Sequence, residues 1–177
     1  MCAHAQTIQM RAHARKSRYD VGMVEEPEGL GAFAALLQVQ AAVVRRLEER
    51  LEEHRLVPIA QYDVLLELNA APGRRLRMQQ LSDRVVLSRS RVSRVVDEME
   101  RVGLVRREPD PEDRRAAFAV ITDDGRAALR KAAPVYLQGI DEEFLSHLGA
   151  GERRSLERSL RKVLDAHHGD SGGGSGP

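Results

Sequence analysis

The spacing of apolar residues in this chain is helical up to Gly103, extended from Leu104 to Ile121, and helical again after Thr122. Before Gly103 the apolar residues recur at steps of three and four, the period of one helix face. Between Leu104 and Ile121, two short runs flank the Pro- and Asp-rich segment 109–113, which favours a turn between two strands. The pattern predicts a mainly α-helical fold that carries one small β-hairpin.

Four helices are predicted ahead of the hairpin. Pro58 opens the second, Ser88 is a favourable N-cap for the fourth, and Gly103 lies where a C-terminal glycine belongs. The first starts at Leu30 with an apolar stripe, and the third covers about 78–85. The residues expected to face inward in the later three are Tyr62, Leu65, Leu66 and Leu68, then Leu81, Val85 and Val86, then Val92, Val95, Val96, Met99 and Val102.

Two more helices are predicted after the hairpin. Thr122 caps the first of them, and Asp123 and Asp124 favour its positive N-terminal end. The predicted organisation is a flexible leader (1–28), a regulator domain (29–168) and a disordered tail (169–177). Within the domain, a DNA-binding lobe covers about 57–121, and dimerisation helices cover about 30–55 and 122–166. A small domain cannot cover the apolar stripes of these outer helices alone, which favours a symmetric pair.

Positive charge is concentrated ahead of and within the hairpin. The whole chain has a formal net charge of +1. Residues 74–115 contain twelve arginines and eight acidic residues, a local difference of +4. Nucleic-acid binding surfaces are typically local basic patches of this kind. Aromatic residues make up only 3% of the chain, which disfavours base stacking and hence single-strand recognition.

The helix that starts at Ser88 is the main candidate site. Its N-terminal turns combine serine and arginine side chains on the face opposite the apolar stripe. A helix N-terminus favours anions, and arginine can donate two hydrogen bonds to a guanine edge. The candidate DNA-binding residues here are Ser88, Arg89, Ser90, Arg91, Ser93 and Arg94. An arginine-rich surface without a binding role is the plainer alternative, but it leaves the hairpin unexplained.

The tip of the hairpin is the second candidate site. Asp113, Arg114 and Arg115 fall where the strands turn, and an arginine at such a tip can enter a narrow minor groove. An ordinary polar loop is the alternative. Candidate phosphate contacts are Arg74, Arg75 and Arg77.

Three segments, 81–90, 92–100 and 103–108, resemble the MarR family of multiple-antibiotic-resistance-type regulators. Residues 110–125 resemble that family's wing signature, which reads Asp-x-Arg, a strand and Thr-x-x-Gly. The resemblance implies a winged helix-turn-helix with helical dimerisation arms. It also implies that Arg115 is the wing arginine, that Asp113 orients it, and that Ser88–Arg94 reads bases. The family further implies a homodimer on a pseudo-palindromic operator, repression, and a small aromatic or anionic effector.

Other functions are weakly supported by the sequence. There is no phosphate-binding glycine loop, nucleophile elbow or metal cluster, so neither an enzyme nor a cofactor or metal site is expected. The single cysteine, Cys2, fits a reducing, cytoplasmic compartment. The chain contains no run of about 18 apolar residues, so no membrane-spanning helix is expected. The alternative kept open is a winged-helix protein-interaction module that does not bind DNA.

Overall fold

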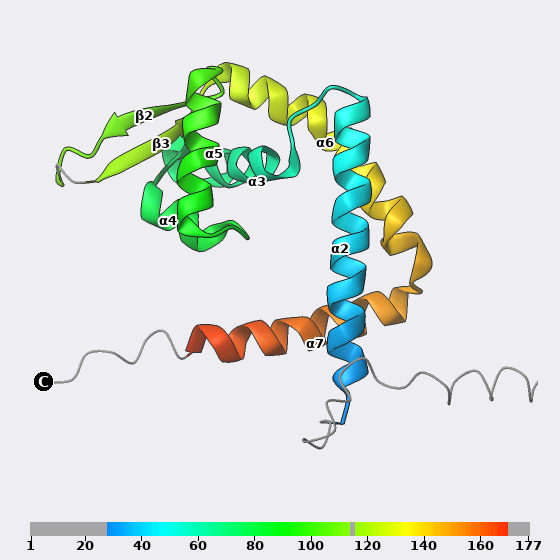
Figure 1. Ribbon diagram of the computed structural model, residues 1–177. Helices are drawn as coiled ribbons and strands as arrows, with labels where there is room; N and C mark the ends of the chain where they lie inside the picture. Colours follow the sequence, from blue (N-terminus) through cyan, green and yellow to red (C-terminus); the bar gives the residue numbers. More distant parts are fainter. Residues whose placement is uncertain (1–27, 114–115, 170–177) are drawn as a thin grey trace, which may run out of the picture. The chain divides into compact units, whose positions relative to one another are not determined.

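The computed structural model describes residues 28–113 and 116–169 (Figure 1). Six helices form most of it: α2 (Leu30–Glu53), α3 (Ile59–Ala70), α4 (Met78–Arg84), α5 (Arg89–Arg101), α6 (Asp123–Glu143) and α7 (Ala150–Gly169). The strands are β1 (Arg75–Arg77), β2 (Val105–Pro109) and β3 (Ala117–Ile121), and the short 3₁₀ turns are η1 (Pro72–Arg74) and η2 (Leu145–His147). The predicted fold class, mainly helical with a small β wing, is confirmed. The leader predicted for 1–28 and the tail predicted for 169–177 lie outside the described residues except for Glu28 and Gly169.

The chain divides into two units between Ala41 and Ala42, within α2. In the described part of the first unit, the predicted apolar stripe of α2 is exposed, with Phe33, Leu36 and Leu37 each at least 43% accessible. By length and composition alone, α2 could cross a membrane, with a mean hydropathy of 1.3 over its most apolar window. No such helix was predicted from the sequence, because Gln38, Gln40, Arg45 and Arg46 interrupt its run of apolar residues.

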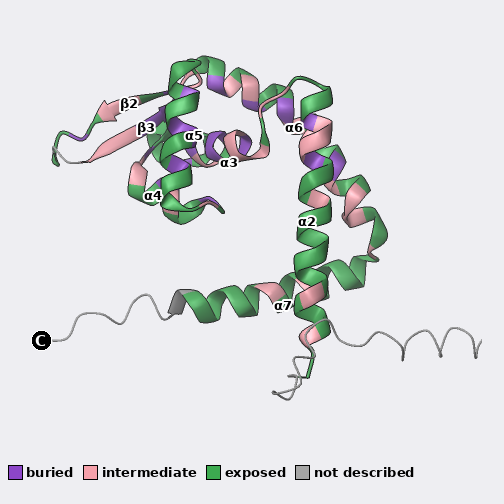
Figure 2. Cartoon of the chain, in the orientation of Figure 1, coloured by how far each residue is buried: buried purple, intermediate pink, exposed green. Residues whose placement is uncertain are grey.

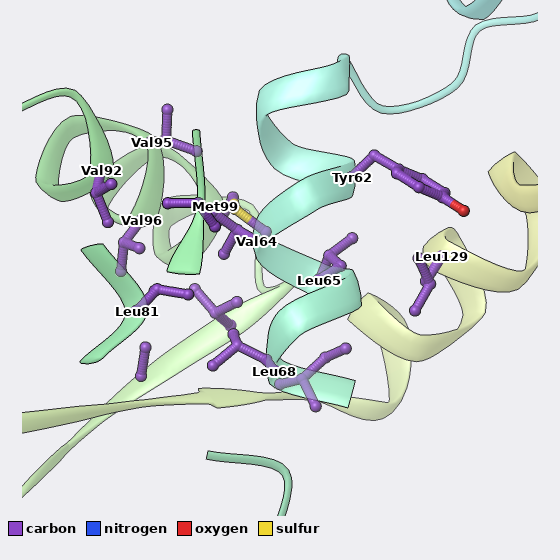
Figure 3. Packing of buried hydrophobic residues seen from close by; sticks show 14 of the residues in the cluster. Tyr62, Val64, Leu65, Leu68, Leu81, Val92, Val95, Val96, Met99 and Leu129 are labelled. Atoms are coloured by element: carbon purple, nitrogen blue, oxygen red, sulfur yellow. The ribbon is translucent and has the colours of Figure 1, made fainter. Parts of the chain in front are cut away.

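The core of the second unit is centred on α3. Tyr62, Val64, Leu65 and Leu68 are buried along this helix, which packs against α4, α5, α6 and the sheet (Figures 2 and 3). The apolar stripe of α5 closes the core from the other side through Val92, Val95, Val96 and Met99. Burial of each such side chain contributes about 1.5–3 kcal/mol. This packing fixes which face of α5 remains in solvent.

Three residues that were expected to face inward are exposed. Leu66, Val86 and Val102 are 44%, 93% and 66% accessible. Leu66 lies on the face of α3 that points away from the core. Val64, on the other face, is buried in the core instead. Val86 belongs to the turn between α4 and α5, and Val102 is the C-cap of α5, so the helical period that predicted their burial has ended at both positions.

The sheet has a third strand that the sequence analysis missed. Its order is β1-β3-β2, with both pairings antiparallel. In β1, Arg77 is opposite Phe118 and Leu76 is opposite Ala119, with Leu76 and Ala119 both buried. The hairpin predicted from Leu104 to Ile121 is confirmed as β2 and β3 (Figure 1). We call residues 105–121 the wing.

Close backbone contacts hold the wing between α5 and α6. Gly103 has φ +77° and ends α5, while Leu104 N donates to Met99 O at 2.9 Å. The predicted Thr122 cap is confirmed, because Gly125 N donates to Thr122 Oγ1 at 3.0 Å. The same hydroxyl donates to Gly103 O at 2.7 Å. A Cβ on Gly125 would lie 2.1 Å from Leu104 O. The spacing Thr-x-x-Gly therefore permits the close approach of α6 to the start of the wing.

Candidate nucleic-acid interface

The N-terminal turns of α5 present a polar surface on a well-packed helix. Val92 and Val96 are fully buried, so the opposite face points to solvent. Every α5 residue predicted to contact DNA is exposed there: Arg89, Ser90, Arg91, Ser93 and Arg94, together with the N-cap Ser88. The structure thus brings these six side chains together on one surface.

Ser88 occupies the predicted N-cap position but does not cap the helix with its side chain. Its hydroxyl lies 3.4 Å from the hydroxyl of Ser90. Since the Ser88 hydroxyl accepts no bond from the first turn, the backbone N–H groups that begin α5 are left without that partner. Such a helix end is suited to a phosphate or another anion.

The arginines of this region divide into paired and unpaired groups. Six form ion pairs: Arg75 with Glu108, Arg77 with Asp110 and Glu112, Arg84 with Glu67, Arg89 with Asp83, Arg106 with Glu108, and Arg107 with Asp97 and Glu100. Arg74, Arg91, Arg94 and Arg101 form no ion pair with any residue in 28–113 or 116–169. Two of these four unpaired cations lie in the first turns of α5.

Arg89 and Arg94 have weak partners within the chain. Arg89 lies 3.6 Å from Asp83, and both side chains are more than half exposed, a geometry that contributes little to stability. Arg94 Nε donates to Ser90 O of its own helix at 3.4 Å. Neither contact is strong enough to prevent these guanidinium groups from binding a phosphate or base instead.

The turn of the wing is held by a buried carboxylate that the sequence analysis did not single out. Asp110 is 3% accessible, and its Oδ2 lies 2.6 Å from Arg77 Nε in an ion pair. The backbone N–H of Glu112 donates to Asp110 Oδ1 at 2.9 Å. This backbone bond, the Arg77 charge and the N–H of Asp113 lower the pKa of Asp110, while burial opposes them. No sequence signal identified Asp110, because aspartate at a turn is usually exposed.

The predicted wing-tip and phosphate residues lie in different surroundings. Asp113 is exposed, and Arg114 and Arg115 lie outside the described residues. Arg74 is exposed at a left-handed backbone position, with φ +55°. The guanidinium carbons of Arg75 and Arg77 lie 4.6 and 5.7 Å from the centre of the Phe118 ring. Arg75 and Arg77 therefore already have carboxylate and aromatic partners, whereas Arg74 has no carboxylate partner among the described residues.

A separate polar cluster of ionisable residues, Tyr62, Asp63 and Tyr136, lies between α3 and α6. The rings of Tyr62 and Tyr136 are 4.3 Å apart between centroids. Burial raises the pKa of Asp63, and the neighbouring charges of Glu48 and Glu67 raise it further. Burial also raises the pKa of Tyr136, with Asp63 adding to the effect. This cluster is not part of the α5 surface.

The sequence and fold match one family of regulators. Residues 57–116 match the MarR family. The transcriptional regulator HosA of Escherichia coli O111:H- is 33% identical over 106 residues, which cover 60% of this chain and 76% of HosA.

Two solved structures from Streptomyces coelicolor have the same fold. AbsC, a MarR family transcriptional regulator, superimposes with a TM-score of 0.74 at 29% identity, covering 82% of this chain and 98% of AbsC. A second MarR family regulator, solved in complex with DNA, also gives 0.74 at 29% identity, covering 81% of this chain and 90% of that one. On this sequence identity and shared fold, the chain belongs to the MarR family of DNA-binding transcriptional regulators.

Proposed function

We propose that this protein represses transcription as a homodimer bound to a pseudo-palindromic duplex operator. Ser88–Arg94, the N-cap and first turns of α5, enters the major groove, and Asp113–Arg115 at the tip of the wing reaches the adjacent minor groove. Arg74 is the strongest candidate for a phosphate contact outside α5, since it is exposed and has no ion pair with a described residue. The DNA-binding lobe then covers about 57–121.

The unpaired arginines at the start of α5 are the observation that carries this proposal. Arg91 and Arg94 project from a helix whose other face is locked into the core through Val92 and Val96. A rigid helix that presents cations without ion-pair partners at its N-terminus is suited to contacts with phosphates and base edges. The relative solved with DNA has the same fold over most of both chains.

The exposed apolar residues of the outer helices support dimerisation with a second copy. Phe33, Leu36 and Leu37 of α2 are exposed, as are Val163 and Leu164 of α7. Large apolar patches are rarely left in water, and a symmetric pair is the usual way to bury them. We assign α2 to this interface rather than to a membrane. Two α5 helices would then reach half-sites about 10 bp apart.

The remaining parts of the proposal follow from the family. A small aromatic or anionic effector modulates binding, and the protein acts in the cytoplasm, where it meets DNA, without an enzymatic activity. The regulator domain covers residues 29–168. Addition of benzoate or hydroxybenzoates to the protein–DNA complex tests the effector, because a true effector releases DNA and shifts the melting temperature of the protein.

Selection of bound fragments from a random duplex pool tests the main proposal. The expected result is an enriched sequence with two inverted half-sites about one helical turn apart. Footprinting should show both half-sites protected at the same protein concentration. Retention of no duplex at low ionic strength would favour the protein-interaction module, and protection of a single unrepeated half-site would contradict the dimeric arrangement.

A further inference from the structure

Asp110 is the single charged residue that is buried among residues 28–113 and 116–169. Its side chain is 1% accessible, although it begins a surface turn between β2 and β3. Removal of a carboxylate from water is costly unless the charge is paired and hydrogen-bonded. The charge of Asp110 is therefore stabilised by its bonds to Arg77 and to the backbone of Glu112, and these bonds in turn restrict the positions of Arg77 and the turn.

The contacts of Asp110 connect the turn to a different strand. Oδ2 lies 2.6 Å from Nε of Arg77, which ends β1. Oδ1 accepts from Glu112 N at 2.9 Å, and Asp110 N donates to Ala116 O at 3.2 Å. Ala116 N also donates to Asp113 O at 2.9 Å. One carboxylate thus fixes the start of the wing turn to the edge of the sheet.

Arg77 connects the same carboxylate to the helix-turn-helix. It is the N-cap residue of α4, and its backbone N–H donates to Gln80 Oε1 at 3.1 Å. It is opposite Phe118 of β3 in the sheet, and its guanidinium lies over the Phe118 ring. α4 packs against α5. The Arg77–Asp110 pair therefore lies between the start of α4 and the turn of the wing.

We infer that Asp110 and Arg77 are positioning residues that hold the turn after β2 at a fixed orientation relative to α5, so that the wing and α5 contact one duplex. This inference rests on the proposed DNA-binding function. It also changes the role expected for Arg77, which the sequence suggested as a phosphate contact. The guanidinium group of Arg77 forms ion pairs with Asp110 and Glu112. Arg77 acts through the wing and is not itself a phosphate contact.

The variant Asp110→Asn distinguishes a positioning role for Asp110 from the direct electrostatic effect of its charge on DNA binding. Loss of a negative charge near a DNA-binding surface should by itself strengthen DNA binding. If Asp110 positions the wing, Asp110→Asn instead weakens binding to the selected operator, by about tenfold or more in fluorescence anisotropy. Glu112→Gln is the matched control, because it removes the same charge from a side chain that is 83% exposed and 3.4 Å from the same arginine. That variant should bind at the parent level or more tightly.

Arg77→Lys tests the other partner and covers the case in which Asp110→Asn does not fold. Lysine retains the charge but not the contact through Nε. Because lysine can still contact a phosphate, a phosphate-contact role for Arg77 predicts near-parental affinity in Arg77→Lys, whereas positioning predicts weaker binding. Parental affinity in Asp110→Asn or in Arg77→Lys would overturn the inference. A parent protein that binds no duplex would instead overturn the proposed function.

Discussion

Arg91 and Arg101 lie near opposite ends of α5, and neither forms an ion pair with a described residue. They are therefore a matched pair for a test of which end of the helix contacts DNA. We expect Arg91→Ala to weaken operator binding by about 1–3 kcal/mol if it reads a base. Arg101→Ala, at the C-terminal end, should leave affinity unchanged. Fluorescence anisotropy with the selected duplex measures both, and an equal loss in the two variants would argue for a nonspecific basic surface.

The sequence identified the positions of the α5 cations but not their pairing. The apolar stripe of α5 was sufficient to predict that Arg91 and Arg94 are exposed. Which arginines are neutralised depends on contacts between distant residues, such as Arg107 with Asp97 and Arg77 with Asp110. Neither pair follows from local periodicity. The buried position of Asp110 was missed for the same reason, since its main cationic partner belongs to another strand.

At the scale of elements, the junction of α5, the wing and α6 depends on one small residue. Gly125→Ala would place a Cβ against the backbone oxygen of Leu104 and the side chain of Ile121. We expect a loss of unfolding free energy of about 1–3 kcal/mol, as for other overpacked sites. Gly151→Ala is the control, because no atom outside its chain neighbours and its own helix backbone lies within 4 Å of the added carbon. Equal urea midpoints for the two variants would contradict the tight junction.

The polar cluster between α3 and α6 makes a pH-dependent prediction. The pKa of Asp63 is raised in the folded protein, so the unfolded chain loses this proton first as the pH rises. Ionisation of Asp63 therefore destabilises the fold at neutral pH, and this penalty disappears below the unfolded pKa of about 3.9.

We accordingly expect Asp63→Asn to raise the melting temperature at pH 7 and to have a smaller effect at pH 4. Asp141→Asn, at an exposed position of α6, should change the melting temperature little at either pH. Thermal unfolding monitored by circular dichroism gives both comparisons. A melting temperature of Asp63→Asn at or below that of the parent at pH 7 would show that burial of this charge is not costly.

Most elements, but not all of their faces, could be predicted from the sequence. The long helices and the hairpin have clear periods, and residues that favour helix ends stand at Ser88, Gly103 and Thr122, although the Ser88 side chain forms no cap. β1 was missed because three residues, Arg-Leu-Arg, are too few to establish a period of two. Leu66, Val86 and Val102 show that an apolar residue next to a buried stripe does not itself have to be buried.

At the scale of the whole molecule, the exposed stripe of α2 is the feature that most requires a partner. We expect Leu37→Glu to shift the protein toward monomer at concentrations where the parent is dimeric, because a carboxylate is poorly tolerated in an apolar interface. Gln38→Glu adds the same charge on the opposite face by helical spacing and should leave the dimer intact. Sedimentation equilibrium distinguishes the two. A parent that is monomeric at all concentrations would contradict the proposed assembly.

The most direct test of the account is the affinity of the purified protein for its selected duplex as a function of salt concentration. Cations from α5 and the wing that contact phosphates should make log affinity fall linearly with log salt. The combined Arg91→Ala and Arg94→Ala variant should bind more weakly throughout. Affinity that is independent of salt, or undiminished in that variant, would contradict the assignment of this surface to DNA.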